Sequence, residues 1–529
     1  MLMSNAHRSS VVALIVTASL VSLPAALAAT GEELLTSKCS ACHARSDDGL
    51  ERVKDSRRTP EGWDMTLIRM MLIHGVKYGE GERAALVKHL ADTRGLAPSE
   101  TASWRYVLER TPGVVEEPED GAVAEMCARC HTYARVALQR RTEDEWLKLV
   151  HFHLGQYPTT EYQALGRDRN WWEIASTDMP KALAELYPHE TKAWSDWAAR
   201  DHADLSGEWR IAGHAAGEGP FEGTLRVTGG DDDRYAVEMT VNHADGRTVS
   251  GSGNAIVYTG YEWRGSVEMD GATIHQVFAV SEDGNGLAGR WFDEANDVDG
   301  GTLAGTRAGP AIVAVIPEYL RAGETGEIAI HGLGLGDDVN LGDGVEVVET
   351  VSADAGRVVV RARAADDAAA GRRDVAVGDA TASAALAVFR TIDSVRVEPA
   401  NTIARVGGGG GPLPPVPAQF DAVAFANGAD GEAGTDDDMR IGVVPATWSV
   451  EPYTEVAAAQ EDARYAGSMD AASGLFMPAE AGLNPERQYD TNNVGDLAVK
   501  ATVTEGGAEV SGTAHLVVTV QRWIDPPIR

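Results

Sequence analysis

The chain has 529 residues, of which 43% are hydrophobic and 24% are charged, and its formal net charge at pH 7 is −34. A chain of this length is too long to fold around a single hydrophobic core, so we expect three to five domains. The large negative charge excludes non-specific binding to nucleic acid, because two polyanions repel each other. No acidic run is long enough to form a tail, so we expect the charge to be spread over solvated surfaces.

The first 29 residues have the features of a secretory signal peptide. His7 and Arg8 precede an apolar stretch, residues 11–23, and the small-residue segment 24–29 follows it. A basic start, a short apolar core and an Ala-x-Ala end are typical of an exported protein. A retained N-terminal anchor is the alternative, but the apolar core is short for a bilayer span, and no later segment is long and apolar enough to form one. We therefore predict a periplasmic protein without a membrane span.

All four cysteines belong to two Cys-x-x-Cys-His strings. The strings are Cys39–Cys42–His43 and Cys127–Cys130–His131. In this pattern the two thiols bind the vinyl groups of a porphyrin and the histidine binds its iron. The alternatives are a thioredoxin-like redox pair, which needs no histidine, and two halves of one zinc site. Because both strings end in histidine and no cysteine is left over, we predict two covalently bound haem c groups.

An internal repeat accompanies the two strings. Residues 57–59 read Arg-Arg-Thr and precede Trp63, and residues 140–142 read Arg-Arg-Thr and precede Trp146 at the same spacing. Apolar residues at helical spacing follow each tryptophan. The repeat predicts two related cytochrome units, each consisting of a haem string, a loop and a helix that begins near the tryptophan.

The repeat also indicates the sixth ligand of each iron. Met70 and His153 each lie seven residues after the tryptophan of their unit, which is two helical turns and places them on the same helix face. We therefore predict that His43 and Met70 bind one iron and that His131 and His153 bind the other. A thioether ligand favours ferrous iron more than imidazole does, so the two haems would differ in potential.

Other residues compete for these ligand positions. Met70 and His153 could instead be ordinary packing residues of a helical core. His74 lies one turn beyond Met70, and Met179 precedes a proline as the ligand methionine of many small cytochromes c does. His151 lies two residues from His153 and points away from the predicted haem face, and His89 is a weaker candidate.

From residue 205 the sequence changes to short alternating segments separated by Gly/Asp turns, which is typical of antiparallel sheets. The predicted fold is an all-α dihaem cytochrome c domain followed by three antiparallel all-β domains, a small barrel and then immunoglobulin-like sandwiches. The predicted boundaries are 1–29 for the signal peptide, 30–203 for the dihaem domain, 204–308 for the barrel, 309–391 for the immunoglobulin-like domain and 392–529 for the C-terminal sandwich. No catalytic motif falls in the β domains, so we expect them to serve as scaffold.

The whole chain resembles the alpha subunit of quinohaemoprotein amine dehydrogenase. The resemblance lies in the order of the parts and in four segments, which are Cys39-Ser-Ala-Cys-His43, Arg58-Thr-Pro-Glu-Gly-Trp-Asp-Met-Thr66, Leu90-Ala-Asp-Thr-Arg-Gly-Leu-Ala-Pro98 and Leu205-Ser-Gly-Glu-Trp209. The resemblance implies a periplasmic heterotrimer that oxidises primary amines to aldehydes and ammonia. It also implies one haem with His/Met ligation and one with His/His ligation, in agreement with Met70 and His153.

The same resemblance implies the partners. A small subunit would carry a cysteine tryptophylquinone, and a β-propeller subunit would help to enclose it. This chain would then take electrons from the reduced quinone and pass them through both haems to a soluble copper protein or cytochrome c, with no catalytic residue of its own. Two other hypotheses remain, a self-contained dihaem peroxidase-type enzyme and a haem-bearing binding protein whose β domains do the work.

Overall fold

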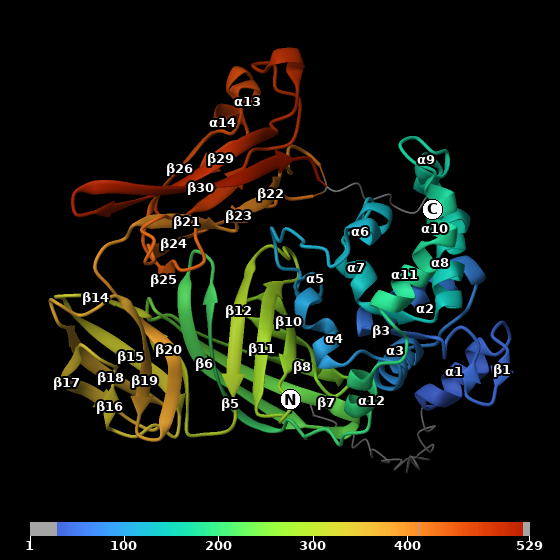
Figure 1. Cartoon of the computed structure of the whole chain (residues 1–529), viewed down its shortest axis with the longest axis horizontal. Coiled ribbons are helices and arrows are strands. Elements are labelled where there is room, and N and C mark those ends of the chain that lie inside the picture. Colours follow the sequence, from blue (N-terminus) through green and yellow to red (C-terminus); the bar gives the residue numbers. More distant parts are fainter. Residues whose placement is uncertain (1–28, 412, 522–529) are drawn as a thin grey trace, which may run out of the picture.

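The computed structural model describes residues 29–411 and 413–521. A helical head comes first in the chain and three β domains follow it, as Figure 1 shows from blue to red. This architecture confirms the predicted fold class. The predicted signal peptide lies almost wholly outside the described residues. Within the described ranges, no helix is long and apolar enough to cross a membrane.

Most of the head is helical, with short strands between the helices. Its helices are α1 (Gly31–Cys39), α2 (Pro60–His74), α3 (Glu82–Thr93), α4 (Pro98–Thr101), η1 (Ala102–Trp104), α5 (Arg105–Leu108), α6 (Gly121–Cys127), α7 (Ala134–Ala137), α8 (Glu143–Gln156), η2 (Pro158–Thr160), α9 (Glu161–Ala164), α10 (Trp171–Thr177), α11 (Met179–Leu186) and α12 (Lys192–Ala198). Its strands are β1 (Arg45–Ser46), β2 (Gly49–Leu50), β3 (Ser56–Arg58) and β4 (Gln139–Arg141).

The repeated Arg-Arg-Thr sequences explain where α2 and α8 begin. Thr59 precedes α2 and its hydroxyl accepts a hydrogen bond from the Gly62 N–H, at 3.2 Å. Thr142 caps α8 in the same way through the Glu145 N–H, at 3.3 Å. A threonine at this position satisfies an N–H that the first turn leaves free. The two caps therefore place both helices in the same register relative to their arginines.

The two repeated units of the head meet at these Arg-Arg-Thr segments. Strands β3 and β4 pair antiparallel, with Arg57 opposite Arg140 and Ser56 opposite Arg141. The first helix turn of each unit buries its tryptophan, Trp63 in one core and Trp146 in the other. The head is thus built from two related halves that are joined through a two-stranded ribbon.

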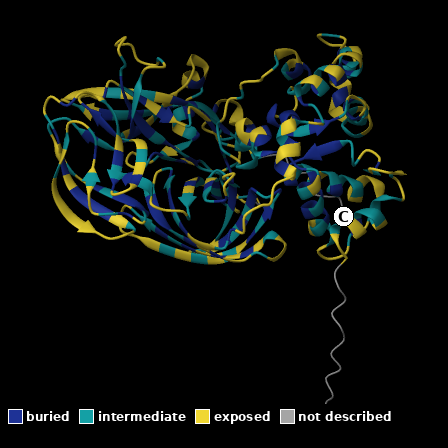
Figure 2. Cartoon of the chain, turned by 60° about the horizontal axis from the view of Figure 1, so that its bottom comes forward, coloured by how far each residue is buried: buried dark blue, intermediate teal, exposed yellow. Residues whose placement is uncertain are grey.

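The second domain is a closed barrel of eight antiparallel strands. The strands are β5 (Gly207–Ala215), β6 (Gly219–Gly229), β7 (Arg234–His243), β8 (Thr248–Tyr258), β9 (Glu262–Met269), β10 (Ala272–Val280), β11 (Gly286–Asp293) and β12 (Gly300–Thr306), and a one-turn helix η3 (Asp231–Asp233) precedes β7. Each strand pairs with the next, and β12 pairs with β5 to close the barrel. Alternate residues point inward and are buried, and the strands in Figure 2 show bands of buried and exposed residues.

The head is attached firmly to this barrel. Trp194 and Trp197 of α12 pack with the apolar side chains of the barrel interior. The Trp197 indole N–H also donates to the Thr259 carbonyl at 2.8 Å. Arg264 of β9 pairs with Glu61 of α2 at 2.6 Å. These contacts hold α2, which carries a predicted ligand, in a fixed position relative to the barrel.

The third domain is a sandwich of two four-stranded sheets. Its strands are β13 (Ala311–Ile316), β14 (Tyr319–Arg321), β15 (Thr325–Leu333), β16 (Val339–Asn340), β17 (Val345–Ala353), β18 (Arg357–Ala364), β19 (Gly371–Val377) and β20 (Ala380–Phe389). The strand orders are β13-β15-β18-β17 and β14-β20-β19-β16. Buried aliphatic residues of both sheets, such as Ile328 and Val375, form the core between them.

The fourth domain is a second sandwich with a small helical insertion. Its elements are β21 (Ser394–Glu398), β22 (Asn401–Arg405), β23 (Ala418–Gln419), β24 (Asp421–Ala426), β25 (Met439–Val443), β26 (Thr447–Pro452), α13 (Glu455–Ala459), α14 (Asp462–Tyr465), β27 (Gly467–Met469), β28 (Leu475–Pro478), η4 (Gln488–Asp490), β29 (Gly495–Glu505) and β30 (Ala508–Thr519). Arg321 of the third domain forms a two-pronged pair with Glu505 here, at 2.6 and 2.7 Å. The last two domains are therefore joined by a charged contact.

Candidate haem sites of the helical head

The cysteines of both haem strings lie at equivalent places. Cys39 is the last residue of α1 and Cys127 is the last residue of α6, and each is half-buried. Cys42 and Cys130 follow in exposed turns. Burial raises the pKa of Cys39, with a further contribution from Cys42, and burial raises the pKa of Cys127 to about 12. A thiol with a raised pKa is a poor thiolate nucleophile, which argues against a thioredoxin-like redox pair.

The two string histidines have the same orientation relative to the backbone. His43 Nδ1–H donates to the Glu51 carbonyl at 3.0 Å, and His131 Nδ1–H donates to the Thr132 carbonyl at 2.9 Å. A hydrogen bond of this kind selects the tautomer that leaves Nε2 free as a metal ligand. Burial lowers the pKa of His131, which favours the neutral imidazole that binds iron. Both histidines therefore have the form that the proximal ligand of a haem requires.

His153, the predicted partner of His131, is prepared in the same manner. Its Nδ1 lies 2.7 Å from the Leu149 carbonyl, one turn earlier in α8, so its Nε2 is also free. Burial lowers its pKa, and the nearby His131 contributes to this lowering. The structure thus places His131 and His153 close enough to interact electrostatically.

Met70 is half-buried near the end of α2, on the same face as the buried Trp63 and Leu67. The helix ends at His74, and Gly75 follows in a left-handed conformation with φ 72°. His74 itself is exposed. The structure therefore places Met70 where the helical repeat predicts it, although its pairing with His43 stays a prediction.

The remaining competitors have ordinary structural surroundings. Met179 begins α11 and is only 6% exposed within the core of the second unit, which contains Trp146 and Tyr133. His151 is exposed and makes an edge-to-face contact with Trp172, with ring centroids 5.0 Å apart. Burial lowers the pKa of His89, which lies against α1. Each of the three thus has a packing role that does not require iron.

The two strings do not combine into a zinc site. Across the described part of the chain, no group of three or more His, Cys, Asp or Glu residues is arranged to hold a metal ion. The four cysteines are all unpaired, so they form no disulfide either. Free thiols beside a histidine with an available Nε2 are the donor set that a c-type haem requires. The residues present therefore fit one covalent haem at each string.

Glu100 is the residue that sequence reasoning missed. Arg57 donates to both of its carboxylate oxygens, at 2.8 and 3.0 Å, and Arg140 Nε donates to one of them at 3.1 Å. The Thr191 hydroxyl and the Ala97 N–H donate to the same carboxylate, at 2.9 and 2.8 Å. The carboxylate lies between the first arginines of the two repeats. The sequence contains one indication of such a residue. Two arginines stand at equivalent positions of the repeat, and if both are buried they require an anion nearby.

The second arginine of each repeat packs on the tryptophan of its own unit. The Arg58 guanidinium lies 5.1 Å from the centre of the Trp63 ring, and that of Arg141 lies 5.5 Å from the Trp146 ring. Such cation–π contacts stabilise a buried arginine and fix the ring. Each part of the Arg-Arg-Thr-x₃-Trp repeat therefore has a structural role, which is a carboxylate contact, a ring contact, a helix cap and a core residue.

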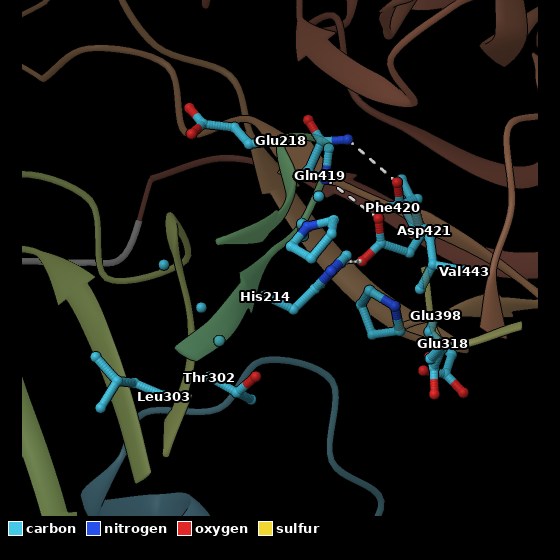
Figure 3. A pocket seen from close by; sticks show the side chains of 18 of the residues that line it. His214, Glu218, Thr302, Leu303, Glu318, Glu398, Gln419, Phe420, Asp421 and Val443 are labelled. Atoms are coloured by element: carbon cyan, nitrogen blue, oxygen red, sulfur yellow. Dashed lines mark hydrogen bonds and ion pairs between the residues drawn. The ribbon is translucent and has the colours of Figure 1, made fainter. Parts of the chain in front are cut away.

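A large cavity lies away from the haem strings, between the barrel, residues 109–114 of the head and the last two domains. Its volume is 1490 Å³, and neither string contributes a residue to its lining. Figure 3 shows His214 of β5 pointing at Asp421 of β24, and their side chains pair at 2.8 Å. Glu218, Glu318 and Glu398 also line it. The cavity is thus an interdomain cleft with a charged lining rather than a haem pocket.

Four family models match successive parts of the chain. They are described as quinohemoprotein amine dehydrogenase A, alpha subunit, haem binding (residues 29–194), and as alpha subunit domain II (202–308), domain III (309–390) and domain IV (395–528) of quinohemoprotein amine dehydrogenase. No curated protein sequence matches the chain.

Solved structures show only weak likeness. A de novo designed fluorescence-activating beta barrel is 20% identical over 20% of this chain and 99% of its own, with a TM-score of 0.17. The Bacteroides ovatus mixed-linkage glucan utilization protein SGBP-B, solved with a heptasaccharide, is 10% identical over 60% of this chain and 62% of its own, with a TM-score of 0.18. Drosophila N-cadherin EC1-4 is 11% identical over 61% and 94%, with a TM-score of 0.15. These scores are too low to support an argument about function.

Proposed function

Because the chain belongs to the quinohemoprotein amine dehydrogenase alpha-subunit family, we propose that it is the dihaem electron-transfer subunit of a periplasmic amine dehydrogenase. It takes electrons from a cysteine tryptophylquinone on a small partner subunit while a primary amine is oxidised. It passes them to a soluble copper protein or cytochrome c. A β-propeller subunit completes the heterotrimer, and the amine site lies on another chain.

The observation that carries the proposal is the duplicated haem site of the head. Both strings end a helix at their first cysteine, and both present a histidine whose Nδ1 bonds a backbone carbonyl. Each bound haem supplies an iron that accepts and releases one electron. The two halves are joined through β3 and β4, which supports a short path between the two irons.

This chain's own residues hold the irons and set their environment. His43 and His131 would each hold an iron through an imidazole nitrogen, and Met70 and His153 would supply the second protein ligand of each iron. Leu149 fixes the ring of His153 through its carbonyl. The thioether of Met70 gives its iron the higher potential and the imidazole of His153 gives the lower one. With this ligation, the two bound haems would supply an electron path from the unit of His131 to the unit of His43.

Purification from the native source tests the assignment. We expect the chain to co-purify with a propeller-sized subunit and a small subunit that stains for a bound quinone, in a 1:1:1 ratio. The competing hypothesis of a peroxidase predicts a haem with an open or displaceable sixth position. If the chain is purified alone and its reduced form is oxidised rapidly by hydrogen peroxide at a high-spin haem, the proposed function is wrong.

A further inference from the structure

A group of buried cations lies between the two cytochrome units. Arg58 and Arg141 are 7% and 3% exposed, and the half-buried Arg69 of α2 and Arg52 act on both of them electrostatically. Burial lowers the pKa of Arg141 to about 10, and burial together with Arg141 and Arg69 holds the pKa of Arg58 well below its ordinary value. Guanidinium groups keep their proton in proteins, so this crowding of positive charge requires an anion.

The carboxylate within the group is already shared. Glu145 contacts Arg52 at 3.2 Å, Lys148 at 3.1 Å and Arg141 at 3.9 Å. Its charge is therefore divided among three cations. By contrast, Arg57 and Arg140, the neighbours of Arg58 and Arg141 in sequence, share Glu100 between them.

Among the described residues, neither Arg58 nor Arg69 forms an ion pair with an acidic side chain, although Glu145 acts on Arg58 electrostatically. Both donate instead to one neutral group, the Thr66 hydroxyl, which Arg69 Nη2 reaches at 3.1 Å. The Nε atoms of both arginines are buried and have no hydrogen-bond partner. An unsatisfied buried donor destabilises the folded state, and more so when it is charged. Two guanidinium groups that converge in this way form a carboxylate-binding geometry, because each offers parallel N–H donors.

Arg58 packs on Trp63 of the first unit, and Arg69 brings the converging pair into contact with the second unit. The Arg69 guanidinium is 5.3 Å from the centre of the Phe152 ring, and Phe152 precedes His153. Arg135 contacts the Met65 sulfur at 2.9 Å, one turn before Arg69, and Arg135 acts electrostatically on both His131 and His153. A carboxylate carried by a group bound at His131 and His153 would therefore meet these arginines.

We propose that Arg58 and Arg69 bind a propionate carboxylate of the haem held by His131. The inference rests on the proposed dihaem function, since the haem supplies the anion. The arginines act as positioning residues that orient this haem toward the ribbon between the two units. Their fixed positive charge also stabilises the ferrous state, whose iron carries one positive charge fewer, and so raises the midpoint potential.

Substitution of Arg69 in the full chain loaded with both haems tests this inference. Arg69→Gln and Arg69→Met remove the charge, and the second keeps an aliphatic side chain against Phe152. We expect either variant to lower the ferrous-to-ferric ratio of the His131 haem roughly tenfold at a fixed potential, which is about 59 mV for one electron. Arg69→Lys keeps the charge and should restore most of the shift. The two haems are resolved by spectroelectrochemistry with near-infrared magnetic circular dichroism.

Arg83→Gln is the matched control, because Arg83 of α3 already has an acidic partner, Asp64 of α2, at 2.6 Å. It should leave both potentials unchanged. The inference is overturned if the charge-removing variants shift neither potential, shift only the haem of His43, or shift no more than Arg83→Gln does. Failure of the proposed function is a separate result, because it would show in the unsubstituted chain, as fewer than two haems or as purification without partner subunits.

Discussion

Glu100→Gln is expected to destabilise the helical head by about 3–5 kcal/mol, because it removes one partner of a buried ion pair and leaves two buried cations without an anion. Arg57 and Arg140 come from the two halves of the head and meet at this carboxylate. Glutamine offers one oxygen and no charge to groups that now share two oxygens. Thermal unfolding of the haem-loaded protein, followed by circular dichroism in the Soret band, measures the loss in the head alone.

Asp64→Asn is the control for this substitution. Asp64 also pairs with an arginine, Arg83, but both side chains are about two-fifths exposed, at 40% and 43%. Exposed pairs of this kind contribute about 0–1 kcal/mol. If Glu100→Gln lowers the unfolding temperature no more than Asp64→Asn does, Glu100 does not hold the two halves together.

The same carboxylate predicts a pH dependence. Burial by itself would raise the pKa of Glu100, but Arg57, Arg140 and the Ala97 N–H outweigh it and the pKa is lowered. A carboxyl with a lowered pKa in the folded state stabilises the fold above its unfolded pKa, and this stabilisation is lost as the pH falls through the lowered pKa. The difference in unfolding free energy between wild type and Glu100→Gln should therefore shrink on acidification below the ordinary glutamate range.

Met70→Leu is expected to abolish the near-infrared charge-transfer band of a methionine-ligated ferric haem. The substitution keeps the volume of the side chain, so packing changes little, but it removes the sulfur that binds iron. The potential of the same haem should fall by about 0.1 V, because axial ligation sets haem potentials over a range of about 0.8 V. Absorption spectra and a redox titration of the haem-loaded chain measure both effects.

Met179→Leu is the matched variant for the competing ligand. Met179 is buried in the core of the second unit, so leucine should be tolerated there and the band should remain. The opposite pattern, with the band lost in Met179→Leu and kept in Met70→Leu, would assign the iron to Met179.

The sequence was informative wherever the determining contacts are local. Within five residues, a haem string provides both thiols and the histidine that a haem c requires. The threonine caps of α2 and α8 likewise act within one helical turn. The helical period placed Met70 and His153 on the face of their tryptophans, but it could not distinguish Met70 from His74, which lies on the same face one turn away. The choice between Met70 and His74 depends on the position of the haem, which a local sequence pattern does not determine.

Non-local pairings could not be predicted. The repeat was visible in sequence, yet nothing in it indicates that Arg57 lies opposite Arg140 in a ribbon or that Glu100 lies between them. Alternation predicted a small barrel, and the structure confirms it, but the closure of β12 on β5 joins strands about ninety residues apart. Similarly, the excess of positive charge around Arg58 becomes apparent only in the folded structure, where α2, β4 and α8 lie close together.

The most direct test of the account is whether electrons from amine oxidation reach both haems only through the partner subunits. Anaerobic addition of a primary amine to the oxidised, purified complex should reduce both haems. In a redox titration of the complex, the haem of His43 should show the higher midpoint potential. The isolated chain with both haems should stay oxidised under the same conditions. Reduction of the isolated chain by amine would contradict the account, as would a complex in which only one haem is reduced.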